Sequence, residues 1–435
     1  MSLKISLNKK LILGKDIDYI FLIFLILLTQ GNILFKVIGL TIIYIFRFNA
    51  IFYIHRFNLF YLFIIIYHLI HGLLILFFKT FSYVPNFLLT LCFWFFSFMS
   101  LNQITYFIKK SSLNEIQSTV KIFFKINVIV VFVQLVMLMI RFNSINPYLV
   151  TTSAGDFIKS IYSNSSVNLI IMSFFVIYFF VKKDWLYGLL ATIILLMTTY
   201  MSGLVLFICS LLLGLFLFSR FKIKYKLLAI FFIVIFGYLF AIISPNNVTY
   251  ATRYINRILE NGENVPFKIK SFWQTINYCS SSLSSFVFGA GGGNFSSRVA
   301  FIVSGDYVRW FPDSWAYASN QFLNNHLSLW NFDFNNPWDN KNNTANQPFS
   351  FYNKIFGEYG LLGFILFYIL YLKYILDKWK GLNHTKLILI SLAGYFLLDY
   401  WFEYFSVIII FELLTLIDIK LSNKSNEKFD LKTND

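Results

Sequence analysis

Arginine and lysine side chains stand in two polar segments, residues 141–165 and 245–355, between long apolar stretches. A guanidinium group donates two parallel hydrogen bonds to phosphate oxygens, so arginines here suit a diphosphate. Arg253 and Arg257 are four residues apart and would share one face of a helix. Any single arginine could instead be a solvated surface charge or contact a lipid headgroup. These alternatives explain the presence of all the arginines together less well. The phosphate-binding candidates are Arg141, Arg253, Arg257, Lys270, Arg298 and Arg309.

The longer polar segment also contains the glycine run Gly289-Ala-Gly-Gly-Gly293. Glycine lets a backbone approach a ligand closely, and successive N–H groups can then point at anionic oxygens. The Lys-Ser/Thr pair of a nucleotide P-loop does not follow the run. The run predicts either an anion-binding loop or a turn, with backbone positions Gly289, Gly291, Gly292 and Gly293.

Four side chains in or beside this segment have the chemistry of a general base. Glu358 stands where the polar segment meets the next apolar stretch, and charges at a membrane boundary are costly and often functional. A carboxylate that stabilises the start of a helix is an equally good interpretation. The four candidates are Glu358, His326, Asp306 and Asp313.

Tryptophan, tyrosine and asparagine are frequent between residues 245 and 355. Flat aromatic faces beside amide groups suit sugar rings, which offer apolar C–H patches and many hydroxyls. Trp and Tyr are also favoured at a membrane interface, so a loop that lies on a bilayer would show the same residues.

The sequence supports neither a metal site nor a cofactor nor nucleic-acid binding. Cys92, Cys209 and Cys279 are scattered and lack the spacing of metal ligands. Asp16-Ile-Asp18 resembles the metal-binding motif of some glycosyltransferases, but the charge distribution described below places it on the cytoplasmic side. The net charge of +16 comes from cations between the apolar stretches, whereas a nucleic-acid site needs them on one face.

The elements that must position these residues are apolar helices. Hydrophobic residues make up 58% of the 435 residues and charged residues only 13%, about half the usual charged fraction. Runs such as 128–140 and 227–243 leave no face for water. The sequence therefore predicts an all-α, polytopic transmembrane helix bundle.

Lys and Arg in short loops face the cytoplasm, and this rule orients the spans. Residues 1–244 would hold nine spans with a short periplasmic loop at 141–165. The large periplasmic loop 245–355, three more spans in 356–419 and a cytoplasmic tail at 420–435 would follow. Both termini are then cytoplasmic, and the N-terminal segment is predicted to be a retained signal anchor. The twelve expected spans are 17–33, 35–47, 58–78, 85–107, 122–140, 166–181, 185–199, 203–218, 227–244, 356–377, 387–401 and 404–419.

This layout resembles the O-antigen polymerase and ligase superfamily, whose members have many spans and one large outer loop late in the chain. Three segments carry the resemblance: Lys270-Ser-Phe-Trp273, Phe288-Gly-Ala-Gly-Gly-Gly-Asn-Phe295 and Glu358-Tyr-Gly-Leu-Leu-Gly363. Phe349 stands where the ligase branch has a histidine, so the resemblance favours a repeat-unit polymerase. Met201-Ser202-Gly203 replaces the Ser-Arg that many relatives carry between the seventh and eighth spans.

The resemblance implies a metal-independent glycosyltransferase of the bacterial inner membrane, acting in lipopolysaccharide or other polysaccharide biosynthesis. Its substrates would be undecaprenyl-diphosphate-linked oligosaccharides, joined on the periplasmic face. Arginines would stabilise the departing diphosphate, and Glu358 ranks first as base because it lies in the third segment. A chain-length regulator and a flippase of the same pathway are further expected partners. An O-antigen ligase and a flippase or other transporter remain the alternative functions.

Overall fold

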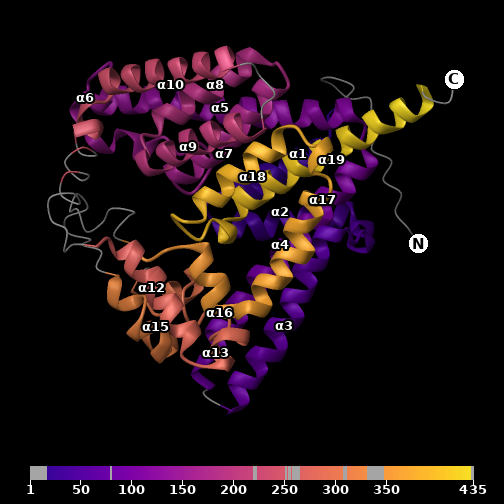
Figure 1. Cartoon of the computed structure of the whole chain (residues 1–435), viewed down its shortest axis with the longest axis vertical. Coiled ribbons are helices and arrows are strands. Elements are labelled where there is room, and N and C mark those ends of the chain that lie inside the picture. The colour runs from indigo at the N-terminus through magenta and orange to yellow at the C-terminus, as the bar shows by residue number, and fades with distance from the viewer. Residues whose placement is uncertain are drawn as a thin grey trace.

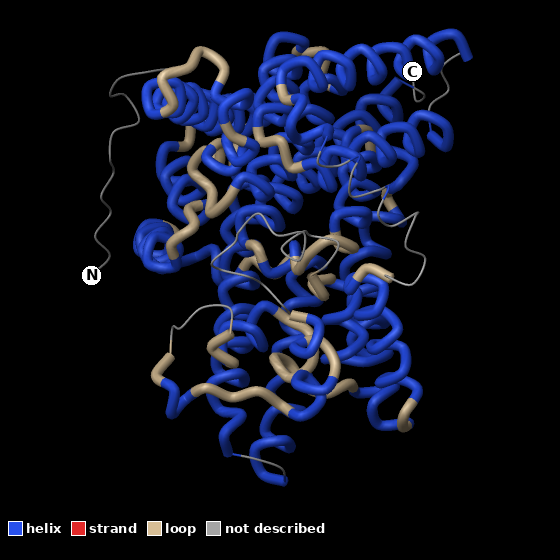
Figure 2. Tube along the Cα trace, turned by 90° about the vertical axis from the view of Figure 1, so that its left-hand side faces the viewer, coloured by secondary structure: helices blue, strands red, loops and turns tan. Residues whose placement is uncertain are grey.

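The structure is a computed structural model that describes residues 17–78, 81–218, 223–249, 252, 256, 265–306, 311–330 and 347–432. This described part of the chain is 81% helical and has no strand, as Figure 2 shows. The predicted all-α class is therefore confirmed.

A helix occupies each of the twelve segments in which a span is expected. Among the described residues, four of these helical segments are long and apolar enough to cross a membrane: Arg56–Phe78, Phe81–Lys110, Leu113–Arg141 and Phe351–Asp377. The count of about twelve spans stays a prediction. The helices in these segments are α1 (Tyr19–Thr29), α2 (Ile33–Phe46), α3 (Arg56–Phe78), α4 (Val84–Lys110), α5 (Leu113–Arg141), α7 (Ser165–Val181), α8 (Trp185–Met197), α9 (Met201–Phe218), α10 (Ile223–Ile243), α16 (Phe351–Leu366), α17 (Lys373–Asp377), α18 (His384–Tyr395) and α19 (Phe405–Lys432).

The first two helices form a hairpin rather than one long helix. At 11 and 14 residues they are roughly 17 and 21 Å long, well short of a hydrocarbon core of about 30 Å. They pack so closely that a Cβ on Gly39 would lie 2.9 Å from Cβ of Leu27. Asp18 caps the start of α1 and pairs with Arg47 at the end of α2, so one ion pair joins the two ends of the hairpin.

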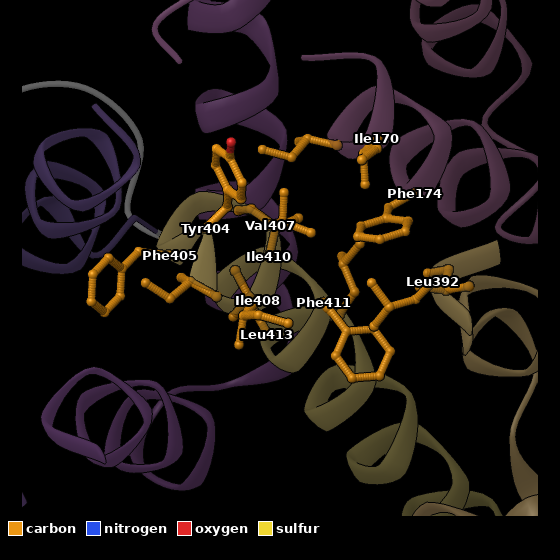
Figure 3. Close-up of a cluster of buried hydrophobic side chains, with 14 of the residues drawn as sticks. Ile170, Phe174, Leu392, Tyr404, Phe405, Val407, Ile408, Ile410, Phe411 and Leu413 are labelled. Carbon is orange, nitrogen blue, oxygen red and sulfur yellow. The ribbon is translucent and has the colours of Figure 1, made fainter. Parts of the chain in front are cut away.

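Helix α19 runs through the centre of the bundle. Its residues from Val407 to Ile417 are buried on every side, which is typical of a helix that is apolar all round. Figure 3 shows part of this core, where side chains of α19 meet Ile170 and Phe174 of α7 and Leu392 of α18.

Buried Glu412 interrupts the apolar surface of α19. Its carboxylate accepts hydrogen bonds from the hydroxyls of Tyr61 at 2.6 Å and Tyr371 at 3.0 Å. A buried carboxylate needs such donors because water cannot reach it.

Several loops that the charge rule assigns to the cytoplasm contact one another, although they are far apart in the sequence. Lys121 pairs with Asp184, and Lys420 donates to the carbonyls of Ile108 and Ser111. In Figure 1 the C-terminal end of α19 lies on the right, whereas α6 (Pro147–Val150), α12 (Phe267–Ser280) and α15 (Asn320–Asn324) lie on the left. The three described segments joined by these contacts, which the charge rule assigns to one side, thus lie together, while the orientation and the sides of the other loops stay predictions.

The described residues between 265 and 349 form a small helical unit at the lower left of Figure 1. It contains α12, α13 (Leu283–Phe288), α14 (Arg298–Val303) and α15. Its own apolar core consists of Ala300, Phe301, Phe322, Phe349 and Tyr400. Because Tyr400 lies just before α19, this core joins the unit to the helix bundle.

The orientation of the bundle can be tested with reporter fusions. A reporter active only in the cytoplasm should give signal after residues 110, 224 and 425, and one active only outside should give signal after residue 330, because the cations lie between the spans in that pattern. Enzymatic activity of both reporters is the measurement. An outward signal at 224 would contradict the orientation.

Candidate functional site

The small helical unit of residues 265–349, here called the outer unit because the charge rule predicts it to face outward, joins the bundle where α16 is broken. Gly360 has φ +61°, outside the helical region, and Gly289 opposite it has φ +72°. A Cβ on Gly289 would lie 2.5 Å from the carbonyl carbon of Glu358, and one on Gly360 would lie 2.5 Å from the carbonyl oxygen of Val287. Both the backbone angles and the close approach therefore require glycine. We call this contact between residues 287–291 and 357–360 the glycine seam.

Hydrogen bonds of the glycine run are made within the protein. The N–H groups of Ala290 and Gly291 donate to the carbonyls of Gly357 and Glu358 at 2.8 and 3.0 Å. The N–H of Gly289 closes the last turn of α13 on Ser285. These three N–H groups are thus not directed at a ligand. For them the structure agrees with a turn and not with an anion-binding loop.

The carbonyls of the remaining glycines fix the run to the tip of the α3–α4 hairpin. Gly292 accepts a hydrogen bond from the hydroxyl of Tyr83 at 2.6 Å, and Gly293 accepts one from the amide of Asn86. The run therefore positions the residues that follow it, from Asn294 to Arg298.

Glu358 is completely buried beneath this loop. Its Oε1 accepts hydrogen bonds from the backbone N–H groups of Phe295 at 3.3 Å and Ser296 at 3.2 Å. A general base must reach the proton it removes, directly or through one water. This geometry favours a positioning role for Glu358 over the role of base.

A buried ion pair lies beside Glu358. The ammonium group of Lys354 pairs with Oε1 of Glu403, and both side chains are at most 2% exposed. The Lys354 ammonium also lies 4.6 Å from the ring centroid of Trp94, which adds a cation–π contact. The second carboxylate oxygen of Glu403 accepts the backbone N–H of Arg298 at 2.8 Å. The ion pair thereby fixes the start of α14.

Arg298 lines an open pocket of about 90 Å³ between the outer unit and the bundle. Its guanidinium lies 4.6 Å from the ring centroid of Tyr404. Lys36 of α2 also lines the pocket, and its ammonium lies 5.1 Å from the ring centroid of Phe405. Much of the remaining wall is apolar and comes from Ile33, Leu89, Phe93, Phe96, Val299 and Ile302. We call this space the cationic pocket.

Asp306 and Asp313 line a second pocket of about 150 Å³ and are both exposed. Ile302 belongs to the walls of this pocket and of the cationic pocket, so the two are neighbours. Of the four candidate bases, these two aspartates are the ones that solvent and a substrate can reach.

His326 is fully buried and its ring packs edge-on against Phe295. Burial, together with the nearby charge of Lys268, lowers the pKa of His326 to about 3. The imidazole is therefore neutral at physiological pH. Lys268 donates to the carbonyls of Phe349 at 2.5 Å and Leu398 at 2.7 Å, and burial lowers its pKa. His326 and Lys268 thus belong to the interior of the outer unit.

The other predicted cations do not meet at the cationic pocket. Arg141 is exposed at the end of α5, where its guanidinium lies 5.0 Å from the ring centroid of Phe157. Lys270 is exposed on α12 beside Phe267. Arg253, Arg257 and Arg309 lie outside the described residues.

Sequence reasoning missed Lys36, Lys354 and Glu403. Each is an ionisable residue in or next to an apolar span, which is itself a signal of function. Lys36 lies near the start of α2, at the end that the charge rule predicts to face outward, where few cations are expected. The sequence shows that these three residues are unusual for their positions. It does not show that the fold brings them close together.

Comparison with known protein families, curated protein sequences and solved structures found no match to this chain. Within the described residues, no group of three or more His, Cys, Asp or Glu side chains is placed to hold a metal ion. Any ligand of the site must therefore be inferred from the chemistry of the pockets.

Replacement of Glu358 distinguishes the role of general base from that of a positioning residue. We expect Glu358→Gln to keep activity within about tenfold, because the amide oxygen still accepts the N–H groups of Phe295 and Ser296, whereas loss of a general base costs about two to four orders of magnitude. Glu358→Ala should lose most activity and lower the melting temperature. The measurement is turnover of purified protein with lipid-linked repeat units, the substrate that the sequence resemblance implies. A collapse of activity in Glu358→Gln at unchanged stability would restore the role of base.

The ion pair of Lys354 and Glu403 can be tested by a double-mutant cycle. Lys354→Met should destabilise the fold by about 3–5 kcal/mol because it leaves a buried carboxylate unpaired, and the double variant Lys354→Met/Glu403→Gln should recover most of this loss. Unfolding in detergent is the measurement. The control is Lys121→Met, which breaks the more exposed pair with Asp184 and should cost about 1 kcal/mol or less. Equal losses for the two single Lys variants would contradict the argument.

Proposed function

We propose that this chain polymerises lipid-linked oligosaccharide repeat units into O-antigen or a related surface polysaccharide. The reaction takes place on the periplasmic face of the bacterial inner membrane, with undecaprenyl diphosphate as the leaving group. The chain layout and the three short segments that resemble the O-antigen polymerase and ligase superfamily support this proposal, and so does the chemistry of the cationic pocket.

The cationic pocket is the observation that carries the proposal. It places Arg298 of the outer unit and Lys36 of the bundle in one space with a largely apolar wall. A lipid diphosphate has the same two parts, a charged headgroup and an apolar chain. Glu403 also lines the pocket, but its carboxylate is already paired with Lys354, which reduces its repulsion of a phosphate.

In the proposed step, a hydroxyl of the incoming repeat unit attacks the anomeric carbon of the growing chain. A glycosidic bond forms, the bond from the anomeric carbon to the diphosphate oxygen breaks, and the hydroxyl proton passes to a base. The diphosphate leaves with more negative charge than it had before, so fixed cations lower the barrier. Asp306 or Asp313 is the proposed base, because both are exposed and share the Ile302 wall with the cationic pocket.

The polysaccharide of a deletion strain distinguishes this function from the alternatives. A polymerase defect leaves a product with a single repeat unit. Polymer that is not attached to its lipid acceptor would indicate a ligase, and accumulation of lipid-linked units at the inner face would indicate a flippase.

Variants of the two pocket cations test the mechanism directly. Arg298→Ala and Lys36→Met should each slow polymer formation about ten- to hundredfold, since a hydrogen bond to a charged group is worth about 1.5–3 kcal/mol. Arg298→Lys should restore little of the lost rate if the arginine makes a bidentate contact with the diphosphate. Chain length formed by purified protein from lipid-linked repeat units is the measurement.

The matched control is Lys159→Ala, which removes an exposed cation from the shorter polar loop. It should leave chain length unchanged. Normal polymer from both Arg298→Ala and Lys36→Met would show that the cationic pocket does not bind the leaving group.

A further inference from the structure

A third pocket of about 280 Å³ opens on the other side of the loop that follows the glycine run. We call it the amide pocket, because asparagine and glutamine side chains form much of its wall. Its lining residues come from the α3 tip, the end of α12, the loop itself and the start of α15. They are Ile75, Tyr278, Ala290, Asn294, Tyr317, Ala318, Ser319, Asn320 and Gln321.

The walls of the amide pocket are held together by hydrogen bonds and ring contacts. The hydroxyl of Ser319 caps α15 by accepting a hydrogen bond from the N–H of Phe322. The same hydroxyl donates a hydrogen bond to the carbonyl of Asn294. Phe295 stacks on Tyr278 with ring centroids 4.6 Å apart, which fixes the orientation of the tyrosine. The pocket is therefore built from several segments and preformed, as ligand sites usually are.

Asn294 leaves one hydrogen-bonding group unused. Its side chain is 4% exposed, and its amide nitrogen donates to the carbonyl of Ala290 at 3.1 Å. Its Oδ1 is buried without a hydrogen-bond partner among the described residues. A buried acceptor without a donor is costly, and Asn294 is one of the residues that line the pocket.

We propose that the amide pocket binds one uncharged sugar residue, a neutral hexose or an N-acetylhexosamine. Amide and hydroxyl groups match the hydroxyls of a sugar, and Tyr278 and Tyr317 offer ring faces to its C–H patches. None of the described lining residues is charged. An acidic sugar would lose hydration without meeting a cation, so the pocket discriminates against it.

The position of the amide pocket fits a substrate that also reaches the cationic pocket. Asn294 lines the first and Arg298 lines the second, and four residues of chain span at most about 14 Å. A diphosphate at Arg298 and a nearby sugar at Asn294 can thus belong to one reaction centre. This link rests on the proposed function, whereas the sugar site itself does not.

The test is direct binding to the purified full-length chain in detergent, followed by saturation-transfer difference NMR. The uncharged probes are N,N′-diacetylchitobiose, cellobiose and lactose, and the acidic probe is digalacturonic acid. At least one uncharged disaccharide should bind saturably, and the acidic probe should not.

Variants then place the binding in the amide pocket. Gln321→Ala and Tyr278→Ala should weaken binding about three- to tenfold, the equivalent of one hydrogen bond or ring contact. Tyr278→Phe keeps the ring and should bind as the wild type does. Asn277→Ala removes an exposed amide from the same helix, outside the pocket, and should change nothing.

Failure of this inference is distinguishable from failure of the proposed function. Saturable binding that Gln321→Ala weakens supports the sugar site even if no polymer forms. The site is overturned if no uncharged probe binds, if both Ala variants bind as the wild type does, or if digalacturonic acid binds as tightly. A polymer assay that still depends on Arg298 would then leave the cationic pocket in place.

Discussion

A helix that breaks near a membrane boundary has to satisfy the backbone carbonyls that the break leaves exposed, because little water is present there. In α16 the break falls at Gly360, and the loop at Ala290 and Gly291 supplies the N–H donors for Gly357 and Glu358. The loop in turn requires glycine, since a side chain on Gly289 would collide with the backbone of α16. The glycine seam therefore fixes the outer unit to the bundle, and both Asn294 and Arg298 take their positions from it.

Charge at the seam follows from the same constraint. The carboxylates of Glu358 and Glu403 are buried with one ammonium group, that of Lys354. Backbone N–H groups donate further hydrogen bonds, those of Phe295 and Ser296 to Oε1 of Glu358 and that of Arg298 to Glu403. Buried charges of this kind contribute little net stability compared with apolar packing, but breaking them is costly. Their structural effect is to hold the start of α14, and with it Arg298, in one place against α4 and α19.

The sequence predicted the location of the helices well and their form less well. Hydropathy depends on local composition, so it located all twelve helical segments. It did not reveal that α1 is only 11 residues long, or that α16 breaks at Gly360, because these features depend on tertiary partners. The partners of the glycine run are the carbonyls of Gly357 and Glu358, more than sixty residues away along the chain. The sequence singled out Glu358 as a boundary charge, but its burial comes from a loop whose path the sequence does not specify.

Lys36 shows what a departure from a statistical rule can reveal. The outer ends of membrane spans tend to lack cations, so a lysine near the start of α2, at the end that the charge rule predicts to face outward, calls for a physical reason. The structure brings Lys36 into the same pocket as Arg298, although 262 positions separate them in the sequence (298 − 36). Two cations that line one pocket repel each other, and this repulsion is relieved when an anion enters beside them. A pocket that is unfavourable when empty and favourable with an anion gains specificity for charge, while its apolar wall and the uncharged amide pocket nearby suit the other parts of a lipid-linked saccharide.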